Sequence, residues 1–287
     1  MLGKTLRGAA VLLVLGTGLS FAAGLPDTTE NVVILAQDSV RLGPHSILAS
    51  GQVVVNNAGG MLTVRPGAGA LKDTEIIAAT VTVQAPASRK PELFDILTNS
   101  FLGEDRATFH DVSPLVGPWP LFSFPSAPVA TPGTGNYVVR QRDGEVTLEQ
   151  GDYGNITVGW NAALNLAGGV YNIKSLTCNS FSHIFASGTT TLNVQRNVHL
   201  ASFSTFTPAA ENVNPRCIVL NVAGPHVRIG LAVVSAVINA PNAAVSLGTG
   251  RTSLVGAGYT GNLAGKTVRV GAFSTLQSAD PLLSPCP

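Results

Sequence analysis

The chain has 287 residues, of which 45% are hydrophobic and only 11% are charged, and its net charge is +1. An average soluble domain carries about 25% charged residues. The balanced charge excludes an ordinary nucleic-acid binder, which needs a basic excess to displace counterions, and the apolar composition excludes a charged disordered tail. We therefore expect no nucleic-acid partner.

Residues 1–22 have the pattern of a secretory signal peptide. Lys4 and Arg7 precede an apolar run over residues 9–19, and the small residues Ser20 and Ala22 mark a cleavage site. This run is shorter than the roughly 20 residues that span a bilayer, and no later stretch qualifies. We expect a secreted or periplasmic protein without a transmembrane segment after signal cleavage. Its mature chain would have 15 basic residues (17 less Lys4 and Arg7) and 16 acidic ones.

The rest of the chain repeats a short pattern in which an aliphatic, a polar and an aliphatic residue precede Gly or Ala. The copies are Val40–Gly43, Ile156–Gly159, Val198–Ala201, Val227–Gly230, Val245–Gly248 and Val268–Gly271. Alternation with a period of two is typical of strands, so the aliphatic residues are predicted to face a core. The middle residues are predicted to face solvent; they are Arg41, Thr157, His199, Arg228, Ser246 and Arg269. The small residue suits a sharp corner, because glycine adopts backbone angles that other residues resist.

The spacing of the repeats predicts the fold. The last four copies are 29, 18 and 23 residues apart, which is typical of a solenoid and too short for a sheet with crossover helices. We predict an all-β, single-stranded, right-handed parallel β-helix (solenoid) of about ten coils and about 50 Å in length. An antiparallel barrel or sandwich is the alternative, disfavoured because Asn-Gly and Asp-Gly hairpin turns are nearly absent.

The coils are expected to be interrupted once. We assign residues 23–84 to the first coils, 85–135 to an insert, 136–279 to the main solenoid and 280–287 to a C-terminal tail. Pro91–Leu97 predicts a short helix within the insert. Residues 114–132 are rich in proline and contain Trp119, Phe122 and Phe124, which predicts either an aromatic binding loop or an extended strap. We favour a strap that packs along the solenoid and hides its aromatic side chains.

Residues that carry catalysis are scarce. Between Tyr153 and Ala279 the sequence contains one acid, Glu211, whereas a glycosidase needs two carboxylates and a calcium site needs several oxygen ligands. The other acids are scattered over the first half. Glu104 and Asp105 could bind a cation with Asp111, but a solvated loop is favoured. We predict no enzyme, no cofactor, and no catalytic, cofactor-binding or metal-ligating residues.

Histidine, glycine and cysteine add no site. The five histidines are not spaced as metal ligands; they are His45, His110, His183, His199 and His226. Residues 256–261 match G-x-G-x-x-G, but no helix pattern or acidic residue follows, so corner glycines explain the match. The three cysteines, Cys178, Cys217 and Cys286, allow one disulfide and leave one thiol over, and the sequence does not say which.

Two possible binding surfaces remain. Arg41, Arg228 and Arg269 share a repeat position and could stack into a basic ladder for a polyanion, although a solvated face is favoured because His199 and Ser246 fall between them. Residues 80–82 and 189–191 contain threonines that suit a flat ice-binding face, but no regular Thr-x-Thr pattern recurs from coil to coil.

Two coil segments suggest a family resemblance. Leu148–Val158 reads L-x-x-G-x-Y-x-x-I-x-V, and Ile238–Gly248 reads I-x-A-P-x-A-x-V-x-L-G. With the Pro-rich strap, they resemble a group of exported bacterial β-solenoid proteins and, more distantly, polymer-forming, bactofilin-like repeats. The resemblance covers about residues 30–277. It implies the fold and export, but no site residues, since members mostly lack an assigned activity.

Taken together, these features predict a secreted or cell-surface structural protein that acts as a non-catalytic rigid scaffold or adhesin-like module. Its expected partners are a polysaccharide, a cell-surface component, or another copy of the chain bound through the solenoid ends. The alternatives are a carbohydrate-binding or carbohydrate-active protein on a β-helix scaffold, and an ice-binding face. A groove that brings two acids within about 10 Å would favour the carbohydrate-active enzyme.

Overall fold

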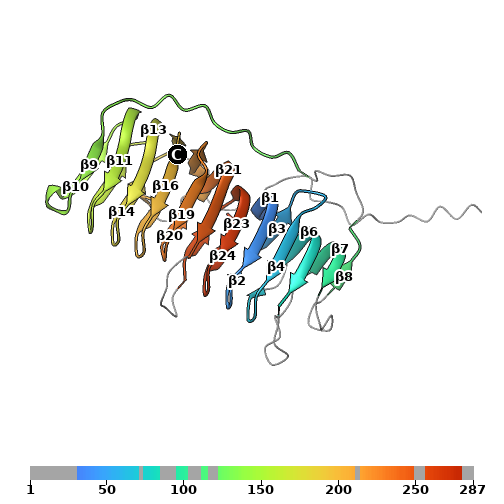
Figure 1. The fold of residues 1–287 in the computed structure, drawn as a ribbon. Helices are drawn as coiled ribbons and strands as arrows, with labels where there is room; N and C mark the ends of the chain where they lie inside the picture. The colour runs from blue at the N-terminus through green and yellow to red at the C-terminus, as the bar shows by residue number, and fades with distance from the viewer. Residues whose placement is uncertain are drawn as a thin grey trace, which may run out of the picture.

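The protein is a parallel β-solenoid of about 10 turns (Figure 1). The structure is a computed structural model that describes residues 31–70, 74–84, 95–102, 111–115, 122–210, 214–248 and 256–279. The strands form one 15-stranded and one nine-stranded sheet, and neighbouring strands run parallel. The prediction of an all-β parallel solenoid is confirmed, and the antiparallel barrel or sandwich is wrong.

The strands fall into two sections of the chain. The N-terminal section contains β1 (Val32–Leu42), β2 (Ile47–Leu48), β3 (Gly51–Val55), β4 (Met61–Val64), β5 (Gly69–Ala70), β6 (Thr74–Val83), β7 (Asp95–Leu102) and β8 (Asp111–Ser113). The C-terminal section begins with β9 (Tyr137–Val139), β10 (Glu145–Leu148), β11 (Gly151–Val158), β12 (Ala163–Leu166), β13 (Gly169–Cys178), β14 (His183–Ala186), β15 (Thr190–Val194) and β16 (Asn197–Leu200). It continues with β17 (Thr205–Pro208), β18 (Ile218–Val222), β19 (His226–Ile229), β20 (Val233–Ser235), β21 (Val237–Leu247), β22 (Gly258–Thr260), β23 (Leu263–Val270) and β24 (Thr275–Gln277).

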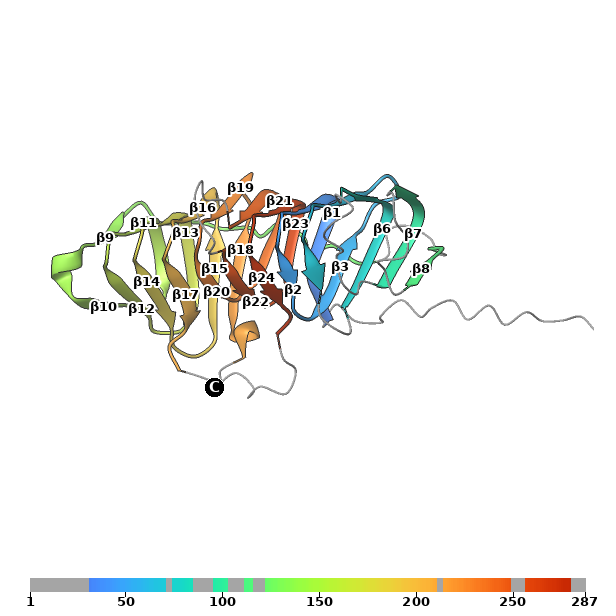
Figure 2. The same ribbon diagram turned by 90° about the horizontal axis from the view of Figure 1, so that it is seen from below.

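Each full turn of the solenoid has three faces. The 15-stranded sheet bends within its long strands, so their first halves, with β3, β8, β15 and β18, form face 1. Their second halves, with β4, β9, β16 and β19, form face 2. The nine-stranded sheet β10-β12-β14-β17-β20-β22-β24-β2-β5 is face 3 (Figure 2).

The repeat pattern places the core as expected. Val227 and Val268 point inward and are 0% and 2% exposed, and both belong to one aliphatic cluster that runs through both sections. None of the six middle residues of the repeat is buried. Because inward apolar side chains stack on those of the next turn, burial of apolar surface holds the turns together along the axis.

The order of turns along the axis differs from the order in the chain. The last turn, β23 with β24, lies between β21 with β22 and β1 with β2, so the C-terminal section stacks directly on the first N-terminal turn. Strands β8 and β9 therefore lie at opposite ends, and an extended segment that includes residues 122–136 carries the chain back along the rod (Figure 1). The junction of β23 with β1 is called the seam below.

The Pro-rich segment packs as a strap. Phe122 is 9% exposed and Phe124 is half-buried, and both pack against outward apolar side chains of face 1, among them Leu35 and Val54. Asn56 pins the strap because its Nδ2 donates to the carbonyl of Phe122 (2.7 Å) and its Oδ1 accepts from the Phe122 N–H (2.9 Å). The preference for a strap over an aromatic binding loop holds at these two residues, whereas Trp119 lies outside the described residues.

The helix expected over residues 91–97 is wrong where the structure describes it. Residues 95–97 begin strand β7, which pairs with β6 and β8 inside the range assigned to the insert. Ile96 and Leu97 are both buried, Ile96 in the core and Leu97 beneath the strap, so burial on both faces of a strand imitated helical spacing. The described residues contain two complete short 3-10 turns, η3 (Gln141–Asp143) and η4 (Pro215–Cys217), and a 3-10 residue at Asn31. No helix among the described residues is long and apolar enough to cross a bilayer.

Corner glycines are required mainly by close packing between turns. A Cβ on Gly43 would lie 2.6 Å from the carbonyl carbon of Gly271, and a Cβ on Gly271 would lie 2.1 Å from the oxygen of Gly248. Of the repeat glycines, Gly248 alone has a positive φ, of 67°. The expectation that glycine supplies unusual backbone angles is therefore right at Gly248, while at the seam its small size matters.

Candidate functional site

Face 3 presents mostly uncharged side chains to solvent, among them the stacked rings of His183 and Phe185 and the exposed aliphatic side chains of Ile47 and Val233. Its strands stack in register, so outward residues form two columns, spaced about 4.8 Å from strand to strand and about 6.6 Å along a strand. The hydroxyl-bearing members are Thr147, Thr205, Thr207, Ser235, Thr260 and Thr275. Among the described residues of these two columns, Glu145 on the terminal strand β10 is the one residue of the types Asp, Glu, Lys and Arg. Asn165 Nδ2 donates a hydrogen bond to its carboxylate. Face 3 is thus a regular, nearly charge-free surface.

A row of exposed aromatic side chains borders face 3 at its corner with face 2. Phe181 and Phe203 occupy equivalent corner positions in successive turns, and Trp160 lies one residue before the equivalent position, Asn161. The three aromatic side chains are 55% (Trp160), 45% (Phe181) and 47% (Phe203) exposed. Their ring centroids are 6.3 Å and 5.0 Å apart. Phe181 and Phe203 have φ of 61° and 62°, a left-handed conformation that bulky residues rarely adopt. Their N–H groups bond to carbonyls of the next turn, which holds the strained corners in a fixed row.

Face 2 carries a column of cationic side chains. Pairing along the sheet places His199 opposite Arg228, Arg228 opposite Ser246, Ser246 opposite Arg269, and Arg269 opposite Arg41. Arg269 and Arg41 are directly adjacent because the last turn of the chain stacks on the first. The sequence does place these arginines at one repeat position, but their separation in the chain hides the contact across the seam.

Face 1 carries a ladder of amide side chains in the C-terminal section. Asn172 Nδ2 donates to Asp152 Oδ1 (2.7 Å), and Asn193, Asn221 and Asn239 each donate to the Oδ1 of the preceding member (2.9, 2.9 and 3.0 Å). Asp152 suits the end of the ladder because a carboxylate only accepts hydrogen bonds. The ladder strengthens the stacking of five turns and leaves the amides paired with one another.

A polar groove of about 410 Å³ brings two carboxylates together on face 1 of the N-terminal section. Glu75 and Asp95 are cross-strand partners, and Gln52 Nε2 donates to Glu75 Oε2 (2.7 Å). Burial raises the pKa of Glu75 more strongly than the bond from Gln52 lowers it, and the negative charge of Asp95 raises it further. Paired strands lie about 4.8 Å apart, so these acids, which look scattered in the sequence, meet the separation set above for a glycosidase.

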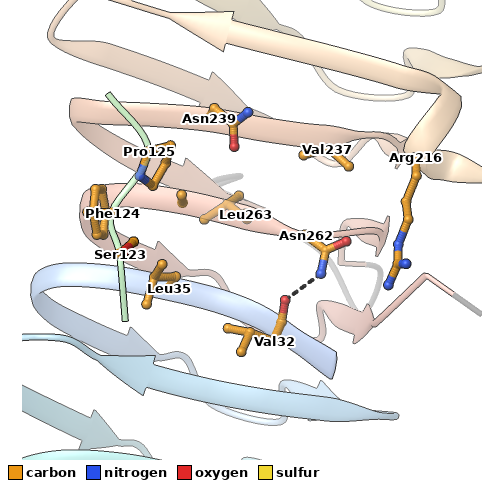
Figure 3. A pocket seen from close by; sticks show the side chains of 11 residues that line it. Val32, Leu35, Ser123, Phe124, Pro125, Arg216, Val237, Asn239, Asn262 and Leu263 are labelled. Carbon is orange, nitrogen blue, oxygen red and sulfur yellow. Dashed lines mark hydrogen bonds between the residues drawn. The ribbon is translucent and has the colours of Figure 1, made fainter. Parts of the chain in front are cut away.

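An apolar groove of about 440 Å³ runs beside the strap. Figure 3 shows Phe124 and Pro125 of the strap on one side, Leu263 and Val32 on the floor, and Arg216 of η4 at the other end. Asn262 Nδ2 donates to the Val32 carbonyl (2.7 Å) and so joins the last turn to the first across this floor. Most of the lining is hydrocarbon.

The cysteines and threonines singled out from the sequence form no site among the residues that the structure describes. Cys217 is disulfide-bonded and Cys178 is free, so Cys178 is the thiol left over. Cys178 is buried, and burial raises the pKa of its thiol to about 12. Within the described ranges no three His, Cys, Asp or Glu side chains are grouped to hold a metal ion. Thr191 lies on face 1 and Thr80 on face 2, so the two threonine segments do not share a face. Glu104, Asp105, His110, Glu211, Cys286, residues 1–22 and residues 280–287 lie outside the described residues, as does the side chain of Asp111.

Sequence reasoning missed face 3 and the carboxylate pair. Face 3 strands have two to four residues each and vary in spacing, so their hydroxyls show no fixed period. Glu75 and Asp95 are 20 residues apart, one turn of the solenoid. Aligning acids by turn, instead of counting them, was the available signal.

Comparison with known proteins gives remote structural likenesses. An ice-binding protein from an Arctic yeast aligns over 90% of this chain and 94% of its own, with 14% identity and a TM-score of 0.39. An ice-binding protein from the Antarctic ascomycete Antarctomyces psychrotrophicus aligns over 87% of this chain and 95% of its own, with 10% identity and a TM-score of 0.30. No family model and no curated protein matches the chain. The likeness to bactofilin-like repeats and to exported bacterial proteins stays a prediction.

Proposed function

We propose that this protein is a non-catalytic, exported β-solenoid that binds ice through face 3. The neighbours reported above are ice-binding proteins, but their likeness is too remote to carry the argument, which rests on face 3 itself. The observation that carries it is the pair of outward columns that stack in register from turn to turn. Over β17, β20, β22 and β24 these columns contain the hydroxyls of Thr205, Thr207, Ser235, Thr260 and Thr275, and the one Asp, Glu, Lys or Arg among their described members is Glu145 at the terminal strand.

Two properties of face 3 suit an ice surface, namely its regular order and its near lack of charged side chains. An ice surface is a fixed array of water molecules, so it is matched best by groups that repeat at constant distances on a rigid support. Each inner strand of face 3 is hydrogen-bonded on both sides, which fixes the columns. Charged side chains hold their own hydration shells strongly, and face 3 nearly lacks them. Exposed Val233 and Ile47 add apolar contact area between the hydroxyls.

The experiment places a bulky side chain in the middle of face 3. Thr207 and Thr260 point outward, so Thr207→Tyr and Thr260→Tyr would lift the surface away from an ice plane without filling the core. Thr177→Tyr on face 2 is the matched control. We expect the parent protein and T177Y to show thermal hysteresis and to partition into growing ice, and the two face 3 variants to lose most of both. Absence of both effects in the parent protein, or equal activity in all three variants, would refute the proposal.

A second candidate function rests on Glu75 and Asp95. Two adjacent carboxylates, one with a raised pKa, are the groups that glycosidases use as general acid and nucleophile or base. The test is release of reducing sugar from xylan, glucan and polygalacturonate by the parent protein and by Glu75→Gln. Release that E75Q abolishes supports a carbohydrate-active enzyme. No release by the parent protein supports the non-catalytic role.

A further inference from the structure

The cationic column on face 2 is an unpaired set of charges. Arg228 and Arg269 are exposed and Arg41 is half-exposed, and none of them has a hydrogen bond or ion pair with a described residue. Asp38, three residues before Arg41, lies at the bulge in β1 before face 2 and likewise makes no ion pair with a described residue. The described strands of face 2 from β9 to β23 contain no Asp or Glu. Nothing in this part of the protein neutralises the arginines.

At the seam, two of these arginines lie side by side and repel each other in the free protein. Arg269 and Arg41 are direct partners on neighbouring strands, about 4.8 Å apart along the axis. Like charges directly opposite each other destabilise a sheet. Thr63 and Ser246 occupy the same column on the two neighbouring turns, which shows that an uncharged residue fits this position. An external negative charge bound between Arg269 and Arg41 would therefore relieve their repulsion.

The shape of the column indicates what would supply that charge. From His199 to Arg41 it extends over four strand spacings, about 19 Å, and it is one residue wide. The neighbouring outward column is uncharged from β21 to β1, where it contains Ala244, Thr267 and Ser39. Exposed Lys266 and Arg196 lie at the corner that leads into face 2. A narrow axial line of cations matches a linear chain with regularly spaced anions better than it matches a plane or a broad double helix.

We infer that face 2 binds an anionic polysaccharide along the rod axis, with Arg228, Arg269 and Arg41 contacting acidic groups of successive sugars. The planar guanidinium binds a carboxylate through two parallel hydrogen bonds, which gives a carboxylated polymer the best fit. The bound polymer would cross the seam and so tie the last turn of the chain to the first. This site is on a different face from the proposed ice-binding surface, and the two can be tested separately.

The experiment uses polygalacturonate as the probe and the whole purified protein. We expect polygalacturonate to bind the protein and to raise its Tm, because the polymer binds the folded state. This binding should weaken at high salt. Neutral dextran should neither bind nor raise the Tm. The variant Arg41→Ser with Arg269→Ser should bind at least about tenfold more weakly and lose the rise in Tm, because two of the three central charges are gone. Without ligand this variant should be at least as stable as the parent, since the like-charge contact is removed.

The matched control removes two exposed arginines at the end of the rod, Arg140→Ser with Arg142→Ser, and should bind as the parent does. Equal loss in the two double variants would mean that net charge alone attracts the polymer. The inference would also be overturned by unchanged binding in R41S/R269S, or by binding to DNA or to vesicles of anionic phospholipid in place of polygalacturonate.

Discussion

The two sections of the molecule use the same column of face 1 in opposite ways. In the C-terminal section this column is Asp152, Asn172, Asn193, Asn221 and Asn239, and its amides bond to one another. The column continues as Ala264 at the seam and then, in the N-terminal section, as Leu35, Val54, Ile77 and Leu97, and all five are buried in the cluster beneath the strap. The backbone is the same on both sides of the seam, so what covers the column decides its chemistry.

In the neighbouring column, two residues earlier in each strand, the polar residues lie mainly in the N-terminal section and the apolar ones mainly in the C-terminal section. It is largely uncharged in the C-terminal section, with Val170 and Val237, and polar in the N-terminal section, with Gln52, Glu75 and Asp95. The strap covers the apolar column but leaves the acidic one open to solvent at Asp95. A solenoid can therefore display different surfaces along one face without changing its core.

The largest expected effect tests the strap. Phe122→Ala should lower the free energy of unfolding by about 3 kcal/mol, because a buried ring leaves a cavity between the strap and the sheet. Phe203→Ala is the matched control: it removes the same ring from a corner where it is 47% exposed, and should cost less than about 1 kcal/mol. Urea denaturation of both variants gives the comparison. A cost for F122A no greater than that for F203A would show that the strap adds little to the stability of the N-terminal section.

The sequence predicted the turns well because the signal is local. Val227, Val268 and the other aliphatic residues alternate within each strand, and this pattern depends only on which side of the strand is buried. It also predicted a strap, since prolines cannot pair within a sheet. The helix over 91–97 was wrong because Leu97 faces outward from its strand but is buried in the apolar cluster that includes Phe122 of the strap. The strand is therefore apolar on both sides, which imitates the spacing of a helix.

Contacts between distant turns could not be predicted in the same way. The pairs Arg269 with Arg41 and Gly271 with Gly43 exist because the chain returns along the strap and closes onto its own beginning. No local pattern encodes that return. The contact of Arg269 with Arg41 in the basic column follows from this stacking order, so a sequence that predicts the turns but not their order leaves it unassigned. The carboxylate pair differs, because Glu75 and Asp95 lie on consecutive turns of the chain.

An intermediate effect is expected from the ladder. Asn221→Ala removes one hydrogen bond to Asn193 and one from Asn239, and should cost about 1–2 kcal/mol at roughly 1 kcal/mol for each bond. Asn239→Ala, at the end of the ladder, removes one bond and should cost about half as much. Urea denaturation of the two variants measures this ratio. No cost in either variant would mean that the amides stabilise the fold no better than uncharged surface residues do, and equal costs would mean that the two bonds of Asn221 do not contribute separately.

The smallest expected effect concerns Glu75, which lies opposite Asp95 in the polar groove. Replacing Glu75 is expected to stabilise the protein, whereas the substitutions above destabilise it. Burial raises the pKa of Glu75 above its ordinary value of 4.5, and Asp95 adds to this effect, although the bond from Gln52 opposes it. The folded protein thus holds this proton more tightly than the unfolded chain does. Its stabilising contribution is complete below the pKa of the unfolded chain and is lost as the pH rises through the higher pKa of the folded state.

Glu75→Gln imitates the protonated group at every pH, so it should stabilise the protein near neutral pH and make little difference in acid. The groove is partly open to solvent and screens the charges, so the gain should be only a few tenths of a kcal/mol. Urea midpoints of parent and variant at pH 3.5, 5.5 and 7.5 test the sign, with Glu145→Gln on β10 as an exposed control. A variant that is less stable at neutral pH would show that the bond from Gln52 outweighs burial, and that Glu75 is an ordinary ionised carboxylate in a polar column.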